Sequence, residues 1–161
     1  MATALITGAT SGIGSAFAEE LARQGHNIVL VARDTVALAK IAQQVRGQGV
    51  EAEILAADLA DPDQLNAVAA RLADAERPID ICVNNAGLGV REEFATSSVA
   101  EEQLMIDVMV TAVMRLSHAV LPVMLNRGTG AIINVSSIAG WLPGGTYSAA
   151  KAWTTVFSES L

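Results

Sequence analysis

The chain has 161 residues, enough for one domain over residues 1–161, and its 52% hydrophobic and 17% charged content is typical of a well-packed α/β protein. Its formal charge of −7 and the absence of any Lys or Arg cluster argue against a nucleic-acid partner and against an anionic membrane surface. The single cysteine, Cys82, cannot form a disulfide within the chain, and the N-terminal segment lacks a signal-peptide pattern, so we expect a cytoplasmic protein.

Short apolar runs alternate with longer segments of helical periodicity along the chain. The runs that predict strands are Ala4–Thr7, Asn27–Ala32, Glu53–Ala56, Ile79–Val83 and Ala131–Val135. The segments that predict helices are Ile13–Gln24, Thr35–Arg46, Pro62–Asp74, Glu101–Leu125 and a last one from about Ser148 to Leu161. This alternation with right-handed crossovers predicts an α/β fold with a doubly wound parallel sheet of the Rossmann type, in the strand order 3-2-1-4-5.

Glycine and proline punctuate this pattern. The glycines placed to end the first, second and fourth helices are Gly25, Gly47 and Gly128. Pro122, near the end of the fourth helix, is expected to kink it or to end its regular part. Arg115 and His118 interrupt the longest apolar stretch, so we expect no membrane span.

The turn after the first strand contains Gly8, Gly12 and Gly14. Glycines at such a turn let a pyrophosphate approach bare backbone N–H groups at the start of a helix. The spacing Gly-x-x-x-Gly-x-Gly differs from the commoner Gly-x-Gly-x-x-Gly fingerprint, and a glycine-rich turn also occurs for backbone reasons alone. Its position directly between the first strand and the first helix favours a nucleotide site.

The end of the second strand indicates which nucleotide. An NAD site usually has an acidic residue there that binds the ribose 2′-hydroxyl, but this strand ends in Ala32 followed by Arg33. Arg33 can pair with a 2′-phosphate, which favours NADP(H). The alternative is that Arg33 is a solvated loop residue and that Asp34 takes the acidic role one place later.

Taken together, these motifs resemble the short-chain dehydrogenase/reductase family over nearly the whole chain. The matching segments are Thr7-Gly8-Ala9-Thr10-Ser11-Gly12-Ile13-Gly14, Asp58-Leu59, Asn84-Asn85-Ala86-Gly87, Asn134-Val135-Ser136-Ser137 and Tyr147-Ser148-Ala149-Ala150-Lys151. The resemblance implies that Asp58 lies beside the adenine. It implies an NADP site formed by Gly8, Thr10, Ser11, Gly12, Ile13, Gly14, Arg33, Asp58, Leu59, Asn85, Ala86, Gly87, Tyr147 and Lys151. By itself the asparagine pair would be only a turn signal.

Tyr147 and Lys151 are one helical turn apart, so their side chains share a helix face. A free tyrosine ionises at a pH of about 10 in water. A lysine ammonium or an oxidised nicotinamide nearby favours the tyrosinate. Tyr147 can then act as general acid when a carbonyl is reduced, or as base when a secondary alcohol is oxidised. The Tyr-x-x-x-Lys spacing also has many occurrences without catalytic meaning.

The resemblance assigns the remaining catalytic role to Ser137, which binds the substrate oxygen, while Lys151 also holds the nicotinamide ribose. Ser137 rather than Ser136 precedes the small-residue turn Ile138-Ala139-Gly140, and strand alternation points Ser136 away, toward packing or a backbone bond. The predicted catalytic residues are therefore Ser137, Tyr147 and Lys151.

Two features depart from the family pattern or leave alternatives open. Met109 stands where the family usually has an asparagine of the proton relay, and methionine cannot make that amide's hydrogen bonds, although its backbone carbonyl could still hold a water. In the short segment before Tyr147, Trp141 or Leu142 either lines a substrate pocket or belongs to the core. Full-length relatives also continue beyond the Tyr147 helix, so we expect the 161-residue chain to lack the C-terminal strands and a substrate-covering loop.

These observations predict an NADP-dependent oxidoreductase that acts on a small-molecule carbonyl or secondary alcohol. The alternatives are a fragment with little turnover and a non-catalytic nucleotide-binding member of the family, of which Met109 would be the marker. His26 and His118 are isolated, so we expect no metal site. The apolar faces of the fourth and last helices are compatible with a homodimer or homotetramer.

Overall fold

The computed structural model describes residues 1–90 and 93–161. Its strands are β1 (Thr3–Thr7), β2 (Asn27–Ala32), β3 (Ala52–Ala56), β4 (Ile81–Asn84) and β5 (Ala131–Asn134). They form a 5-stranded parallel sheet in the order β3-β2-β1-β4-β5, which confirms the predicted topology. The helices are α1 (Gly12–Arg23), α2 (Thr35–Arg46), α3 (Pro62–Leu72), α4 (Val99–Ile106), α5 (Ala112–Arg127) and α6 (Gly145–Glu159), with a π segment η1 (Asp107–Thr111) and a 3-10 turn η2 (Ile138–Trp141).

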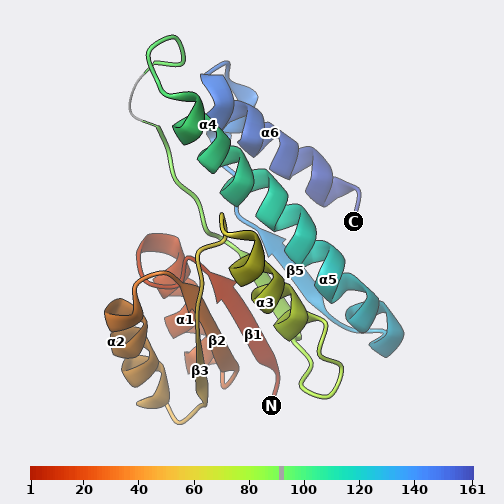
Figure 1. Ribbon diagram of the computed structural model, residues 1–161. Helices are drawn as coiled ribbons and strands as arrows, with labels where there is room; N and C mark the ends of the chain where they lie inside the picture. Colours follow the sequence, from red (N-terminus) through yellow and green to blue (C-terminus); the bar gives the residue numbers. More distant parts are fainter. Residues whose placement is uncertain (91–92) are drawn as a thin grey trace.

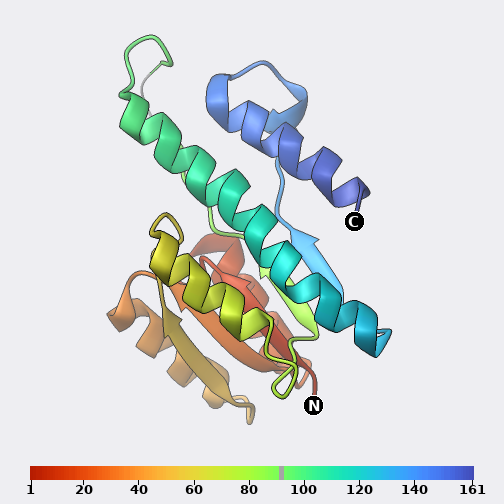
Figure 2. The same ribbon diagram turned by 45° about the vertical axis from the view of Figure 1, so that its right-hand side comes forward.

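Helices cover the sheet on both faces. Helices α1 and α2 lie on one face, and α3 and α5 lie on the other (Figures 1 and 2). On the first face Ile6 and Leu30 are fully buried, and on the second Leu5 and Val31 are fully buried. Burial on both faces explains why the central strands read as continuous apolar runs rather than as alternating ones.

The starts of the helices differ in one informative way. Asp34, Asp61 and Ser98 each cap the following helix, because their side chains accept hydrogen bonds from backbone N–H groups of its first turn. Ser11, at the N-cap of α1, makes no such side-chain bond. Among these four helices, α1 is therefore the one whose N-cap side chain makes no hydrogen bond to the backbone N–H groups of the first turn.

The long helix of the second half differs from the expected one. It begins at Val99, two residues before the expected start, and runs through the π segment η1 and past Pro122 to Arg127. The expectation that Pro122 ends the helix is wrong, because Val120 and Met124 on either side of it are held in the core against the sheet. Although Val99–Arg127 is long and apolar enough to cross a membrane, part of its surface is buried in this way.

Strand β5 and helix α6 form the edge of the molecule. Strand β5 is only partly buried, and α6 packs beside η1 and α4 rather than over the centre of the sheet (Figure 2). Helix α6 begins at Gly145 instead of the expected Ser148. Tyr147 consequently lies in its first turn, and Lys151 follows one turn later on the same helix.

Candidate functional site

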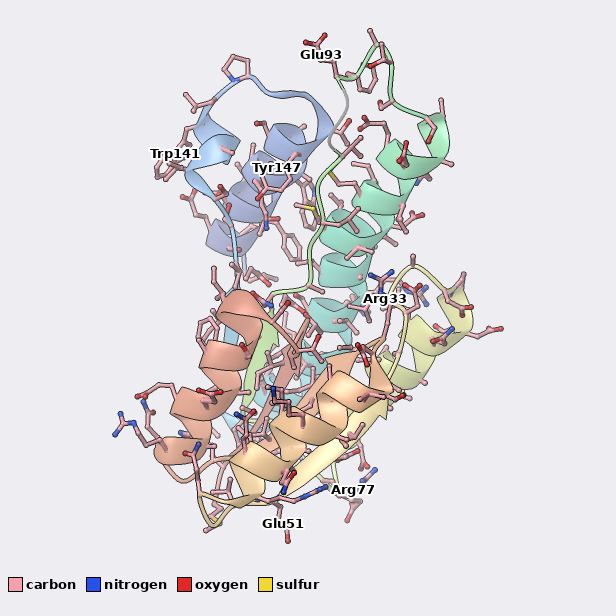
Figure 3. The ribbon with its side chains drawn as sticks, turned by 90° about the vertical axis from the view of Figure 1, so that its left-hand side faces the viewer. Arg33, Glu51, Arg77, Glu93, Trp141 and Tyr147 are labelled. Atoms are coloured by element: carbon pink, nitrogen blue, oxygen red, sulfur yellow. The ribbon has the colours of Figure 1, made fainter. Side chains whose placement is uncertain are left out.

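A cavity of about 640 Å³ lies at the carboxyl ends of the strands. It extends from the turn after β1 to the start of α6, and Arg33 and Tyr147 both lie above the strand ends (Figure 3). The predicted site residues that line it are Gly8, Thr10, Ser11, Ile13, Arg33, Asp58, Leu59, Asn85, Ala86, Gly87, Ser137, Tyr147 and Lys151. The structure thus brings the expected nucleotide and proton-transfer residues to one cavity.

Gly12 and Gly14 do not line this cavity, and they serve it in different ways. Gly14 is buried, and a Cβ there would overlap the Gly8 carbonyl oxygen and lie 2.5 Å from Asn85 Nδ2, so only glycine lets α1 start against this turn. Gly12 has a φ of +54° and open space where a Cβ would be. With Ser11 not capping the helix, the start of α1 fits the phosphate group of a nucleotide.

A hydrogen-bonded pin joins the ends of β1 and β4 beneath the cavity. The buried hydroxyl of Thr7 donates to the Val83 carbonyl at 3.3 Å and accepts from the backbone N–H groups of Asn85 and Ala86, both at 3.0 Å. The Asn85 side chain in turn donates to the Thr7 carbonyl at 3.0 Å. The structural role of Thr7 was not predicted from the sequence, because these hydrogen bonds join segments that are far apart in the chain.

At the other end of the cavity, the side chains after β2 take different positions. The Arg33 side chain is 73% exposed, and its Nη1 lies 4.0 Å from Asp58 Oδ2. Asp34 Oδ1 accepts hydrogen bonds from the backbone N–H groups of Val36 and Ala37, both at 2.9 Å, and so caps α2. Because Asp34 is committed to this cap, the geometry favours Arg33 as the residue that meets a nucleotide here.

Lys151 is buried and held at the centre of the expected catalytic group. Its Nζ donates to the Val135 carbonyl at 2.7 Å and lies 5.9 Å from the centre of the Tyr147 ring. Burial lowers the pKa of Lys151, since the charged form loses hydration. The Ser137 hydroxyl lines the same cavity and accepts from the Ala139 N–H at 3.2 Å. The catalytic roles of these side chains stay predictions.

The second serine lies as strand alternation predicts. Ser136 Oγ donates to the Lys151 carbonyl at 2.8 Å and lies 2.8 Å from Thr155 Oγ1. Its hydroxyl is thus bound to α6, which leaves Ser137 as the serine suited to contact a substrate.

Met109 and the segment before Tyr147 lie differently from the simplest expectations. Met109 is buried and does not line the cavity; it sits behind Gly87, where an added Cβ would be 3.9 Å from its Sδ. Trp141 is 76% exposed and Leu142 62%, so the alternative that they belong to the core is wrong. Neither lines this cavity, and a place in a substrate pocket stays a prediction. Figure 3 shows Trp141 on the outer side of its turn.

The sequence analysis did not identify every residue that lines the cavity. Among those it missed, Leu104 and Val108 lie one turn apart on the α4–η1 helix and form an apolar part of the cavity wall. Their helical spacing is the signal that could have identified them, but a buried stripe has the same spacing. Within residues 1–90 and 93–161, no three His, Cys, Asp or Glu side chains gather to hold a metal ion.

A larger cavity of about 900 Å³ lies at the opposite ends of the strands. Its arginines are already bonded within the chain: Arg71 to Glu53, Arg127 to Asp80 and Arg46 to the Ala52 carbonyl. The smaller cavity is the candidate site, because it alone combines the glycine turn with Tyr147 and Lys151.

Known proteins share this fold and much of this sequence. The chain is 42% identical to a short-chain dehydrogenase from Sphingobium yanoikuyae in complex with NADPH, with a TM-score of 0.97 over 100% of this chain and 65% of that one. It is 37% identical to the bulky-bulky ketone specific alcohol dehydrogenase from Comamonas testosteroni, also at a TM-score of 0.97, over 100% of this chain and 66% of that one.

A third relative is known from its sequence. The ketoacyl reductase HetN of Nostoc sp. is 35% identical over 99% of this chain and 58% of its own length. The chain therefore spans about 58 to 66% of the length of these three relatives. The family model for short chain dehydrogenases matches residues 2–161, and with the glycine turn and the Tyr147–Lys151 pair in one cavity, the chain belongs to the short-chain dehydrogenase family.

Proposed function

We propose that the protein is an NADP(H)-dependent oxidoreductase that interconverts a carbonyl compound and the corresponding secondary alcohol. The observation that carries this proposal is the continuous cavity between the uncapped start of α1 and the Tyr147–Lys151 pair on α6. A nucleotide with its phosphates at α1 would extend along this cavity toward Tyr147. When bound, the nicotinamide cofactor supplies hydride chemistry to the site.

The preference for NADP(H) rests on Arg33 and Asp34. Arg33 is the exposed cation at the end of β2, and Asp34 is occupied as the cap of α2. A guanidinium can bind a 2′-phosphate through charge-assisted hydrogen bonds, whereas an NAD site would place an acid here. The NADPH complex of the Sphingobium relative supports the same choice.

The proton-transfer role is proposed for Tyr147. The centre of its ring lies 5.9 Å from Lys151 Nζ, and its side chain lines the cavity. Tyr147 would donate its phenolic proton to the substrate oxygen in reduction and accept it back in oxidation. Ser137, on the same wall, would hold that oxygen by a hydrogen bond.

The apolar part of the cavity wall favours an apolar substrate. Leu104 and Val108 line the cavity and belong to the apolar cluster against which Tyr147 packs. A ketone with alkyl or aryl substituents matches this surface better than a polyol does. The ketone-specific relative from Comamonas supports that substrate class.

The test combines binding and turnover. NADPH and NADH are titrated into the protein by calorimetry, and NADPH oxidation is then followed against a panel of alkyl ketones, aryl ketones and polyol-derived ketoses. We expect tighter NADPH than NADH binding and turnover of the apolar ketones. NADPH binding without turnover of any carbonyl would instead support the non-catalytic alternative, and no binding of either nucleotide would reject both.

We also propose that α4 and α6 meet a second copy of the chain. Val99 and Val156 are 84% and 68% exposed, and an apolar groove between the two helices is lined by Phe94, Ile106 and Ala149. Light scattering after size exclusion should show a dimer or tetramer, and Val99→Glu should shift it toward monomer.

A further inference from the structure

Helix α6 is joined to the end of β5 by a ladder of side-chain hydrogen bonds. Asn134 Nδ2 donates to Ser158 Oγ at 2.9 Å, and two residues further along the strand direction Ser136 Oγ contacts Thr155 Oγ1 at 2.8 Å. As the chain advances from Asn134 to Ser136, the partner on α6 moves back by about one turn.

The ladder ends on Lys151, which is gripped at two points. The Ser136 hydroxyl donates to the Lys151 main-chain carbonyl at 2.8 Å, while the Lys151 Nζ donates to the carbonyl of the adjacent Val135 at 2.7 Å. Thr155 Oγ1 also lies 3.1 Å from the Lys151 carbonyl oxygen. Since each hydroxyl has one proton, two of the three contacts among Ser136, Thr155 and this carbonyl are hydrogen bonds at any one time. Two consecutive residues after β5 thus fix both the backbone and the ammonium of one lysine.

A second contact presses on the same turn of α6. A Cβ added to Gly140 would lie 2.9 Å from the Lys151 carbonyl carbon and 2.8 Å from the backbone nitrogen of Ala152, so η2 packs against the helix backbone there. Asn134, at the strand end of these contacts, is also hydrogen-bonded within the sheet. Buried Asn84 donates to Asn134 Oδ1 at 2.8 Å and to Ser117 Oγ at 3.1 Å.

We propose that Ser136 and Thr155 are positioning residues of the active site, which set the axial position of α6 so that the Lys151 ammonium lies beside the Tyr147 ring. The expected effect on turnover rests on the proposed function, whereas the placement of the Lys151 ammonium beside the Tyr147 ring does not. Strand β5 is only partly buried, so apolar packing alone fixes the position of α6 weakly along its axis. Because hydrogen bonds are directional, the contacts of Ser136 and Thr155 fix the axial position of α6 where packing does not.

The chain offers a direct readout of this geometry, because Tyr147 is its only tyrosine. The nuclear Overhauser effect between its ring protons and the Lys151 Cε protons therefore reports the placement of the ammonium beside this one ring, with no substrate or cofactor present. The other charged side chains that line the cavity are Arg33, Asp34 and Asp58, and Glu102 lines the neighbouring groove with Thr146. The variants below change none of them.

The experiment compares variants that remove or keep one hydroxyl. Ser136→Ala and Thr155→Val each remove one hydroxyl, and we expect this nuclear Overhauser effect to weaken as the Lys151 ammonium moves away from the ring. Thr155→Ser keeps the hydroxyl and should give the same effect as the unchanged protein. Ser160→Ala is the matched control, because Ser160 Oγ bonds only to the Phe157 carbonyl on the same helix, at 2.6 Å.

Turnover provides the second readout. In the presence of NADPH and a ketone, Ser136→Ala and Thr155→Val should lower kcat roughly five- to tenfold, with little change in the KM for NADPH. If neither variant weakens the nuclear Overhauser effect between Lys151 and Tyr147 while circular dichroism shows a native fold, the positioning role is wrong. If the effect weakens but no variant, nor the unchanged protein, oxidises NADPH, the inference stands and the proposed function fails.

Discussion

The two halves of the candidate site are built by different means. After β1 the site is mainly backbone: the glycine turn and the start of α1 face the cavity next to a strand whose residues Ala4–Thr7 are buried. Around β5 and α6 the site is side chains, and hydrogen bonds rather than a deep apolar core hold them. The nucleotide half of the site, around the glycine turn, therefore depends on the absence of side-chain atoms there. The proton-transfer half, around α6, depends on which functional groups are present.

This difference predicts which measurable quantity each substitution changes. In the glycine turn, an added methyl group should alter folding or nucleotide affinity, because no side-chain chemistry is lost. In the α6 region, removal of a hydroxyl should alter turnover with little change in affinity, because the cavity keeps its shape.

Gly14→Ala should have the largest effect. The added Cβ would overlap the Gly8 carbonyl oxygen, and the backbone on both sides belongs to β1 and α1, so neither can yield easily. Overpacking of this kind costs about 1–3 kcal/mol or more. We expect a clear drop in melting temperature by circular dichroism and no measurable NADPH binding by calorimetry.

Two other glycines make the controls for Gly14→Ala. Gly12 has a φ of +54° and Gly49 a φ of +86°, and a Cβ at either meets nothing within 4 Å. Both Ala variants should share a similar backbone cost of about 1 kcal/mol. Gly12→Ala should lose NADPH affinity and Gly49→Ala should keep it. Equal affinity in all three variants would show that the turn does not bind the nucleotide.

Tyr147→Phe should lower kcat by about 10²- to 10⁴-fold, the usual contribution of a positioned general acid or base. The phenyl ring keeps its place beside Lys151 and only the transferable proton is lost, so NADPH affinity should stay close to that of the unchanged protein. Steady-state kinetics and a calorimetric titration on the same sample separate the two quantities. Retention of most of the turnover would mean that another group transfers the proton.

The same contrast explains which parts of the molecule the sequence could predict. The sheet order and the cavity residues follow from apolar runs and from motifs that are local in the chain. The role of Thr7 could not be predicted, because its hydroxyl accepts a hydrogen bond from the Asn85 N–H, which follows the neighbouring strand β4 and is far away in the sequence. The π segment and the continuation past Pro122 depend on hydrogen-bond register and on core packing, which periodicity does not contain. Exposure of Trp141 likewise depends on where its turn packs.

Arg33→Ala should reduce NADPH affinity about tenfold and change NADH affinity much less. A charge-assisted hydrogen bond contributes about 1.5–3 kcal/mol, and the exposure of Arg33 places the effect at the lower end of that range. Arg23→Ala is the matched control, since its side chain is 69% exposed and pairs with Glu20 on α1, away from the cavity. An equal loss for both nucleotides would contradict the 2′-phosphate assignment.

Met109→Asn should have the smallest effect on turnover, and it tests the boundary between the two halves. Met109 packs behind Gly87 of the nucleotide half and belongs to the buried cluster that also contacts Tyr147. An amide placed there is buried, so we expect a loss of stability of about 1–3 kcal/mol, measured by urea unfolding. If the amide finds a water that links to Lys151, kcat should rise a few-fold or its pH optimum should broaden, as the family pattern implies. Met109→Leu, which keeps an apolar side chain of similar volume, should change stability by less than about 1.5 kcal/mol and leave the pH profile in place. A stability loss with no kinetic change would mean that Met109 serves packing alone and that the relay runs through the backbone carbonyl instead.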